Sequence, residues 1–214
     1  MTKLVRSRLL TLVAAILAAS FVWAAPARFA VGLKDAAGKS YEALIFANDE
    51  KLTVVGPDEA YGACSEGDRM VSGMWQVTLR KHGSKSATPQ KNLLLFHDTN
   101  RGEFNLNRHM VFALPGRPSI LVVEQYSDSN GHEARLFAIS GGKLRSLSST
   151  YYRPNAPLRL HGVAPLKYRS AGYDNSVGLW TITDWKFDPA KWRFSATRKR
   201  QLRYDDPKLT ELAR

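Results

Sequence analysis

The chain of 214 residues has a single cysteine, Cys64, so no disulfide bond can form within it. A fold without disulfides has to be held together by its hydrophobic core. Cys64 has three possible roles: a nucleophile, a thiol that joins two chains, or a small buried residue. It lies in the segment GPDEAYGACSEGDR, whose acidic residues disfavour a thiolate, so we do not expect a catalytic cysteine.

Helical periodicity is also missing from the sequence. No run of ten or more residues combines a helical spacing of apolar residues with helix start and stop signals. Short apolar or alternating runs separated by turns predict an all-β domain of mainly antiparallel meander sheets, either sandwich-like or like part of a propeller. One short C-terminal helix is expected, with Asp206 as its N-cap, Pro207 at its first position, and Leu209 and Leu212 on one face.

The common motifs of catalytic and metal sites are absent. There is no GxSxG, P-loop or GxGxxG, and the five histidines are scattered without HxH or HExxH spacing. Asp128-Ser129-Asn130-Gly131 is similar to part of a calcium loop, but Tyr126 stands at the first ligand position and Phe137 at the closing one. We therefore interpret this segment as a turn, and we predict neither a metal nor a cofactor.

Only one long hydrophobic run is present, and it lies at the N-terminus. Three basic residues precede the apolar segment 9–22, and Val22 and Ala24 are suitable residues for a cleavage site. This pattern is typical of a secretory signal peptide, so we expect residues 1–24 to be removed and 25–214 to form a single periplasmic or secreted domain. An uncleaved membrane anchor is the alternative, for which the run is short. We expect no transmembrane segment after cleavage.

Acidic residues are scarce relative to basic ones. The chain has 31 Lys and Arg against 19 Asp and Glu, a formal net charge of +12, and three of the basic residues belong to the expected signal peptide. Clustered positive charge attracts anions, so an anionic partner is favoured. We expect that partner to be an anionic polymer or a glycan of the cell envelope, and we expect no nucleic acid.

The clearest strand pattern lies between residues 118 and 148. Residues 120–123 are all apolar, so in a strand apolar side chains would point to both faces. This predicts a strand that is covered on both faces and central in its sheet. A polar turn, a second run at 134–139 and the pair Gly141-Gly142 follow, so the stretch is predicted to be a meander. The residues that we expect to be buried are Ile120, Val122, Val123, Leu136 and Phe137.

Several further strands are predicted nearer the N-terminus. Residues 71–80 alternate between apolar and polar, as in a half-buried strand. Residues 41–47 and 52–55 flank Asn48-Asp49-Glu50, which predicts a hairpin. Residues 92–97 are apolar and short, so they are predicted to form another strand.

A first candidate binding segment is 151–175, the longest stretch without a clear strand. Long loops in compact domains are often functional. Arginine and aromatic side chains together suit sugars, phosphates or flat ligands. Alternatively, the tyrosines cover the end of a sheet and the arginines are solvated. The candidate ligand-binding residues here are Tyr152, Arg153, Arg169 and Tyr173.

A second candidate segment is the C-terminal hairpin, predicted from residues 177–187 and 192–204 around a type I turn at Asp188-Pro189. We expect its aromatic residues to lie on one side, with Phe187 facing Trp192 and Trp185 facing Phe194. No acidic residue occurs between Lys191 and Tyr204. Arg198, Lys199 and Arg200 are therefore candidate anion ligands, and a solvated basic face is the alternative.

Two functions remain open from the sequence. The first is an exported, non-enzymatic β-protein that binds an anionic or carbohydrate component of the envelope. The alternative is a periplasmic hydrolase whose site is formed by residues distant in sequence, such as Glu124 with a histidine. A pocket gathering Glu124, a histidine and an aspartate would favour the enzyme, and a flat or grooved basic surface would favour binding.

Overall fold

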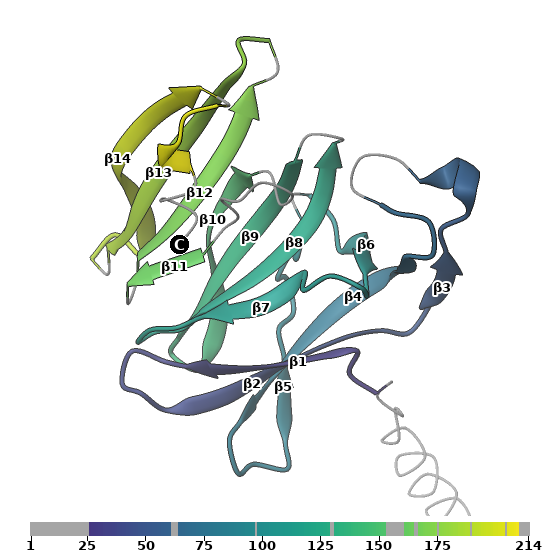
Figure 1. The fold of residues 1–214 in the computed structure, drawn as a ribbon. Helices are drawn as coiled ribbons and strands as arrows, with labels where there is room; N and C mark the ends of the chain where they lie inside the picture. The colour runs from purple at the N-terminus through teal and green to yellow at the C-terminus, as the bar shows by residue number, and fades with distance from the viewer. Residues whose placement is uncertain are drawn as a thin grey trace, which may run out of the picture.

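The structure is a computed structural model that describes residues 26–60, 64–96, 98–128, 131–152, 161–164, 167–174, 176–188, 190–203 and 205–209. The expected signal peptide lies outside these residues. Within them the chain forms three sheets in which every strand pair is antiparallel, so the all-β, antiparallel prediction is confirmed (Figure 1). None of the helical segments in the described ranges has the length and apolar character needed to cross a membrane.

The first sheet is built on one long strand, β4, whose inward residues alternate with outward ones as the sequence predicts. Two strands lie end to end along one side of β4 and two along the other, and β1 extends the sheet beyond β2. The strands are β1 (Phe29–Lys34), β2 (Ser40–Ala47), β3 (Lys51–Val54), β4 (Arg69–Lys81), β5 (Ala87–Pro89) and β6 (Arg101–Asn105). A short 3₁₀ turn, η1 (Pro57–Glu59), follows β3.

The predicted hairpin between β2 and β3 is wrong. Both strands pair antiparallel with β4 and run in the same direction, separated by residues 48–50. Asp49 explains the absence of a chain reversal, because its Oδ1 accepts the backbone N–H of Met74 at 2.6 Å. Gly73 is required opposite this segment, since a Cβ there would lie 2.7 Å from the Cβ of Ala47. The polar triplet therefore makes an irregular continuation along β4.

The predicted strand at residues 92–97 is also absent from the described part of this segment, which forms turns between β5 and β6. Asn100 holds the turns in place: its Oδ1 accepts the Leu95 amide at 2.7 Å, and its Nδ2 donates to a carbonyl of the same segment. Leu95 and Phe96 are buried in the core. Gly102 of β6 gives the Phe96 ring its space, because a Cβ there would lie 2.2 Å from the ring.

The central sheet is the meander expected from the sequence. Its strands lie in the order β10-β9-β8-β7. Gly141 and Gly142 form the turn between β9 and β10 with φ values of 58° and 72°, a conformation that glycine adopts without strain. The strands are β7 (Val111–Leu114), β8 (Ile120–Asp128), β9 (Gly131–Ser140) and β10 (Lys143–Tyr152).

The two faces of β8 belong to two different cores. Leu121 and Val123 pack in a cluster with residues of the first sheet, including Trp75. Ile120 and Val122 pack in a second cluster with residues of the third sheet. The five residues predicted to be buried are each at most 1% exposed, so the prediction of a central strand covered on both faces is confirmed.

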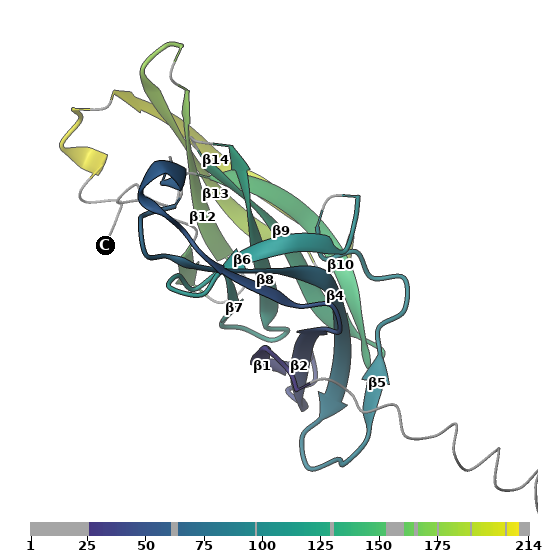
Figure 2. The same cartoon turned by 90° about the vertical axis from the view of Figure 1, so that its right-hand side faces the viewer.

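The third sheet has the order β11-β12-β13-β14. Its aromatic residues Tyr168, Phe187 and Phe194 belong to the second cluster, and so this sheet covers one face of the central sheet. In both views the β1, β2 and β5 strands lie toward one end of the molecule and β12 to β14 toward the other (Figures 1 and 2). The strands are β11 (His161–Ala164), β12 (Lys167–Asp174), β13 (Leu179–Asp188) and β14 (Arg193–Arg203).

The C-terminal hairpin is formed by β13 and β14, but its predicted register is wrong by two residues. Phe187 pairs with Phe194, and Trp185 pairs with Ala196. The turn is longer than expected because Asp188 Oδ1 accepts backbone N–H groups within it, and Trp192 takes a φ of 50°. A shift of two residues preserves parity, so the aromatic side chains still gather on the side that packs on the central sheet.

The predicted C-terminal helix is not supported. In residues 205–209 the chain makes a single turn, closed by the Leu209 amide donating to the Asp206 carbonyl at 3.0 Å. Leu209 is 6% exposed and packs on Trp180 and Ile182 of β13. This segment therefore covers one end of the outer face of the third sheet.

Candidate anion-binding face

Basic residues from three strands share the outer face of the third sheet, which points away from the central sheet. The strand register puts their side chains on the same side of the sheet, since Arg169 and Arg198 both stand opposite Asp184. We call this surface the arginine face. Its basic members are Lys167 and Arg169 of β12, Lys186 of β13, and Arg193, Arg198 and Arg200 of β14.

An irregularity in β14 places two of these arginines on the outer face. Phe194 and Ala196 have the same parity in the sequence as Arg198, so a regular strand would put all three on the inner face. The register shifts between Asp184 and Trp185, which leaves Thr197 as an extra residue in β14. Thr197 Oγ1 donates to the Asp184 carbonyl at 3.1 Å. The bulge therefore separates the aromatic half of the strand from its basic half.

Asp184 lies at the centre of the face and holds two guanidinium groups. Arg169 Nε lies 2.6 Å from Oδ1, and Arg200 Nη2 lies 2.9 Å from Oδ2. All three side chains are between 17% and 21% exposed. Burial opposes the charged form of the carboxyl, but the hydrogen bond from Arg169 and the positive charges around it outweigh burial and lower the pKa of Asp184.

The exposed part of the face carries an excess of positive charge. Lys167 and Lys186 stand directly opposite each other on neighbouring strands, and the next position in the same row is Ser195. Like charges in this arrangement are destabilising. Lys167, Lys186 and Arg198 are exposed, and their side chains make no hydrogen bond or ion pair with another described residue. They are therefore available to an anion in solvent.

Four of the seven predicted site residues are brought to this face. Arg169, Arg198 and Arg200 surround Asp184, and Tyr173 shares their side of the sheet. Tyr173 stands at the far end, where its ring centroid lies 4.9 Å from that of Trp180, so its contacts there are with the packed core. Thus the arginines form the charged part of the face and the tyrosine belongs to its covered end.

The other three predicted residues are not brought together there. Lys199 has the opposite parity from Arg198 and Arg200, and it is exposed on the other side of β14. Tyr152 is the last residue of β10, but its side chain is outside the described part of the structure, and so is the whole of Arg153.

Sequence reasoning missed Asp184 and Lys167, and it did not name Lys186 as a ligand. The strand LWTITDWKFD is rich in aromatic residues and threonine, and apart from Asp188 at its end it has one acidic residue, Asp184. Such an isolated acid predicts a nearby cation, and this was the available signal. The two lysines could not have been paired from the sequence, because their opposition depends on the register of β12 with β13.

Residues that would support an enzyme do not assemble in the described part of the chain. Glu124 is 7% exposed on β8, beside Ala134 of β9. Its side of β8 is the one that faces the third sheet. No group of three or more His, Cys, Asp or Glu side chains suited to a metal ion occurs among the residues that the structure describes.

The cysteine also lacks the setting of a nucleophile. Burial raises the pKa of the Cys64 thiol, and the negative charges of Asp68 and Glu103 raise it further, against a smaller opposing effect of Arg108. A raised pKa keeps the thiol protonated and unreactive. The acidic surroundings seen in the sequence therefore have the expected effect on this residue.

Comparisons with known proteins add no functional information. No family model matches the chain, and no curated protein or solved structure matches it. The function must be inferred from the geometry and charge of the molecule.

Proposed function

We propose that this protein is an exported, periplasmic or secreted, non-enzymatic β-protein that binds an anionic or carbohydrate component of the envelope through the arginine face. The observation that carries the proposal is the gathering of six basic side chains from three strands on one side of a sheet. Two acidic residues share this side. Asp184 is held by two arginines, and Asp188 accepts turn amides with its Oδ1.

The opposed lysines support binding more than a solvated surface. A cross-strand Lys–Lys pair costs folding free energy that an acidic residue at either position would remove. Lys167 and Lys186 stand in this arrangement beside the exposed Arg198. A bound phosphate or carboxylate would offset the repulsion, because it places negative charge between the cations.

The chemistry of Asp184 supports binding rather than catalysis. A general acid or base needs a proton affinity close to the working pH. The pKa of Asp184 is shifted downward, away from that range, and both of its oxygens are held by guanidinium groups. Its role is to fix Arg169 and Arg200 in place.

The central sheet packs between two hydrophobic clusters, one on each face, and this supports a sandwich-like interpretation of the fold.

Export is tested by the N-terminus of the mature protein. Mass spectrometry of cell fractions is expected to find a protein beginning at Ala25 outside the cytoplasm. A cytoplasmic species that keeps residues 1–24 would contradict this part of the proposal.

Binding is tested by two charge-matched double variants of β13 and β14. Lys186→Gln with Arg198→Gln removes two exposed cations from the arginine face. Lys199→Gln with Arg203→Gln removes the same charge from the opposite side of β14. Binding to lipopolysaccharide and to peptidoglycan fragments is measured by calorimetry after circular dichroism has shown that each variant is folded.

The first variant is expected to bind at least about tenfold more weakly than the parent, because a hydrogen bond to a charged group contributes roughly 1.5–3 kcal/mol. The control variant is expected to keep most of its affinity. If both variants bind like the parent, or if the parent binds neither material, the proposed function is wrong.

A further inference from the structure

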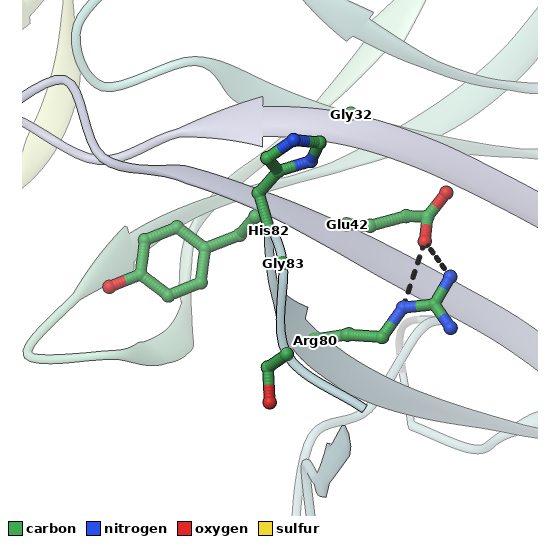
Figure 3. A pocket seen from close by; sticks show the side chains of 7 residues that line it. Gly32, Glu42, Arg80, His82 and Gly83 are labelled. Carbon is green, nitrogen blue, oxygen red and sulfur yellow. Dashed lines mark hydrogen bonds and ion pairs between the residues drawn. The ribbon is translucent and has the colours of Figure 1, made fainter. Parts of the chain in front are cut away.

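A hollow lies on the first sheet, far along the chain from the arginine face. Figure 3 shows this hollow, which has a volume of about 390 Å³. Its volume lies toward the small end of the range for ligand pockets, about 300–1,000 Å³. Gly32, Glu42 and Arg80 form one row across β1, β2 and β4, and His82 lies just beyond the end of β4.

The wall of the hollow presents a donor and an acceptor side by side. Nε and Nη2 of Arg80 both donate to the same oxygen of Glu42, Oε2. The other two polar atoms, Glu42 Oε1 and Arg80 Nη1, make no hydrogen bond to another described residue. The Glu42 side chain is 35% exposed and the Arg80 side chain 42%. The pair is neutral overall, so its free edge suits a ligand with hydroxyl groups rather than a charged one.

His82 adds a further polar group at the edge of the hollow. Its backbone N–H donates to the Ser40 carbonyl at 2.9 Å, which extends the pairing of β2 with β4 by one residue. Its imidazole borders the hollow beside Gly32 and the Glu42–Arg80 pair (Figure 3). The ring makes no hydrogen bond within the described residues, so its two nitrogens are available to a ligand.

Gly32 is a glycine that the fold does not require. A Cβ added at Gly73 or Gly102 would clash with a neighbour, whereas one added at Gly32 would meet nothing within 4 Å, and no positive φ demands glycine there. Glycine inside a strand lowers stability, and it often marks a place where a ligand approaches the backbone closely. Gly32 lines the hollow, so the space left by its missing side chain belongs to that site.

We propose that the hollow over Gly32 binds a neutral polyhydroxyl compound, such as one sugar unit. Adjacent hydroxyl groups donate to Glu42 Oε1 and accept from Arg80 Nη1, His82 supplies a third hydrogen bond, and the ring lies over Gly32. This site is separate from the arginine face and does not depend on the function proposed for that face.

The test uses amide chemical shifts of the full-length mature protein with three probes: D-glucose, N-acetylglucosamine and myo-inositol. At least one probe is expected to shift the amides of Gly32, His82 and Gly83. Gly32→Val places a side chain in the hollow without a backbone clash and is expected to abolish these shifts. Ala30→Val is the matched control, since Ala30 has the same parity on β1 and lies outside the hollow.

Glu42→Gln provides a second test that leaves the space unchanged. It is expected to weaken binding about tenfold, because the charged acceptor is lost while the shape is kept. Shifts at the pocket amides that persist equally in Gly32→Val would overturn the proposal. So would the absence of such shifts with all three probes. Melting temperatures of Gly32→Val and Ala30→Val that are no lower than that of the parent confirm that loss of binding is not loss of fold.

Discussion

The central sheet and the third sheet differ in how many of their faces are covered. On β8 both parities are apolar, and each packs in a different cluster. On β13 and β14 one side packs on the central sheet and the other carries the arginine face. The central strands therefore stabilise the fold by packing on both faces, whereas the exposed part of the outer face of the third sheet can carry charged side chains.

The largest expected effect comes from placing a charge in the doubly covered sheet. Val122 is fully buried, so Val122→Asp is expected to destabilise the domain by about 4 kcal/mol or more, because the new carboxylate has no partner to offset its desolvation. Urea unfolding followed by circular dichroism measures the change. Lys199→Asp, which puts the same residue at an exposed position of β14, is expected to cost less than about 0.5 kcal/mol. A similar loss in both variants would remove the distinction between the two sheets.

A smaller effect is expected from the carboxylate that holds the charged face together. Asp184→Asn leaves Arg169 and Arg200 largely buried without a counter-charge, which is expected to cost about 2 kcal/mol near neutral pH. Because the folded-state pKa of Asp184 lies below its ordinary value of 3.8, its contribution is present above that value and is lost as pH falls through the lower folded pKa. The free energies of unfolding of the parent and of Asp184→Asn are measured from pH 7 to pH 2, and the difference between them is expected to shrink only at the acid end. A difference that does not change with pH would show that the charge of Asp184 is not its cause.

The sequence was sufficient to predict the central sheet. Two apolar parities in residues 120–123, a polar turn and the pair Gly141-Gly142 are local signals, and each has one simple interpretation. The structure confirms the first and the third. The middle of the predicted turn lies outside the described residues, and β8 and β9 pair up to Asp128 and Gly131 on either side of it.

The errors in the prediction have a common physical cause. This applies to three of the departures, in each of which a polar side chain bonds to the backbone where the path or the register changes: Asp49 between β2 and β3, Asp188 in the last hairpin, and Thr197 in β14. Whether such a side chain reverses a chain or lets it continue depends on a partner strand, which a single segment does not reveal.

The candidate site was predictable only in part for the same reason. Arg169, Arg198 and Arg200 stood out by composition, but their meeting at Asp184 depends on two strand registers and one bulge. Lys199 was grouped with its neighbours because the three residues are consecutive. Consecutive residues on a strand point to opposite sides, and the structure separates them in this way.

The most direct test of the account is the salt dependence of polyanion binding, because salt screens the charges of the arginine face and does not alter the hydrophobic clusters. The affinity of the protein for lipopolysaccharide is measured over a series of NaCl concentrations, alongside the two double variants of Lys186 with Arg198 and of Lys199 with Arg203. Screening weakens contacts between exposed charges, so the parent and the Lys199 and Arg203 variant are expected to lose affinity steeply and in parallel. The Lys186 and Arg198 variant is expected to bind weakly with a clearly flatter dependence. Equal slopes for all three proteins would contradict the assignment of binding to the arginine face.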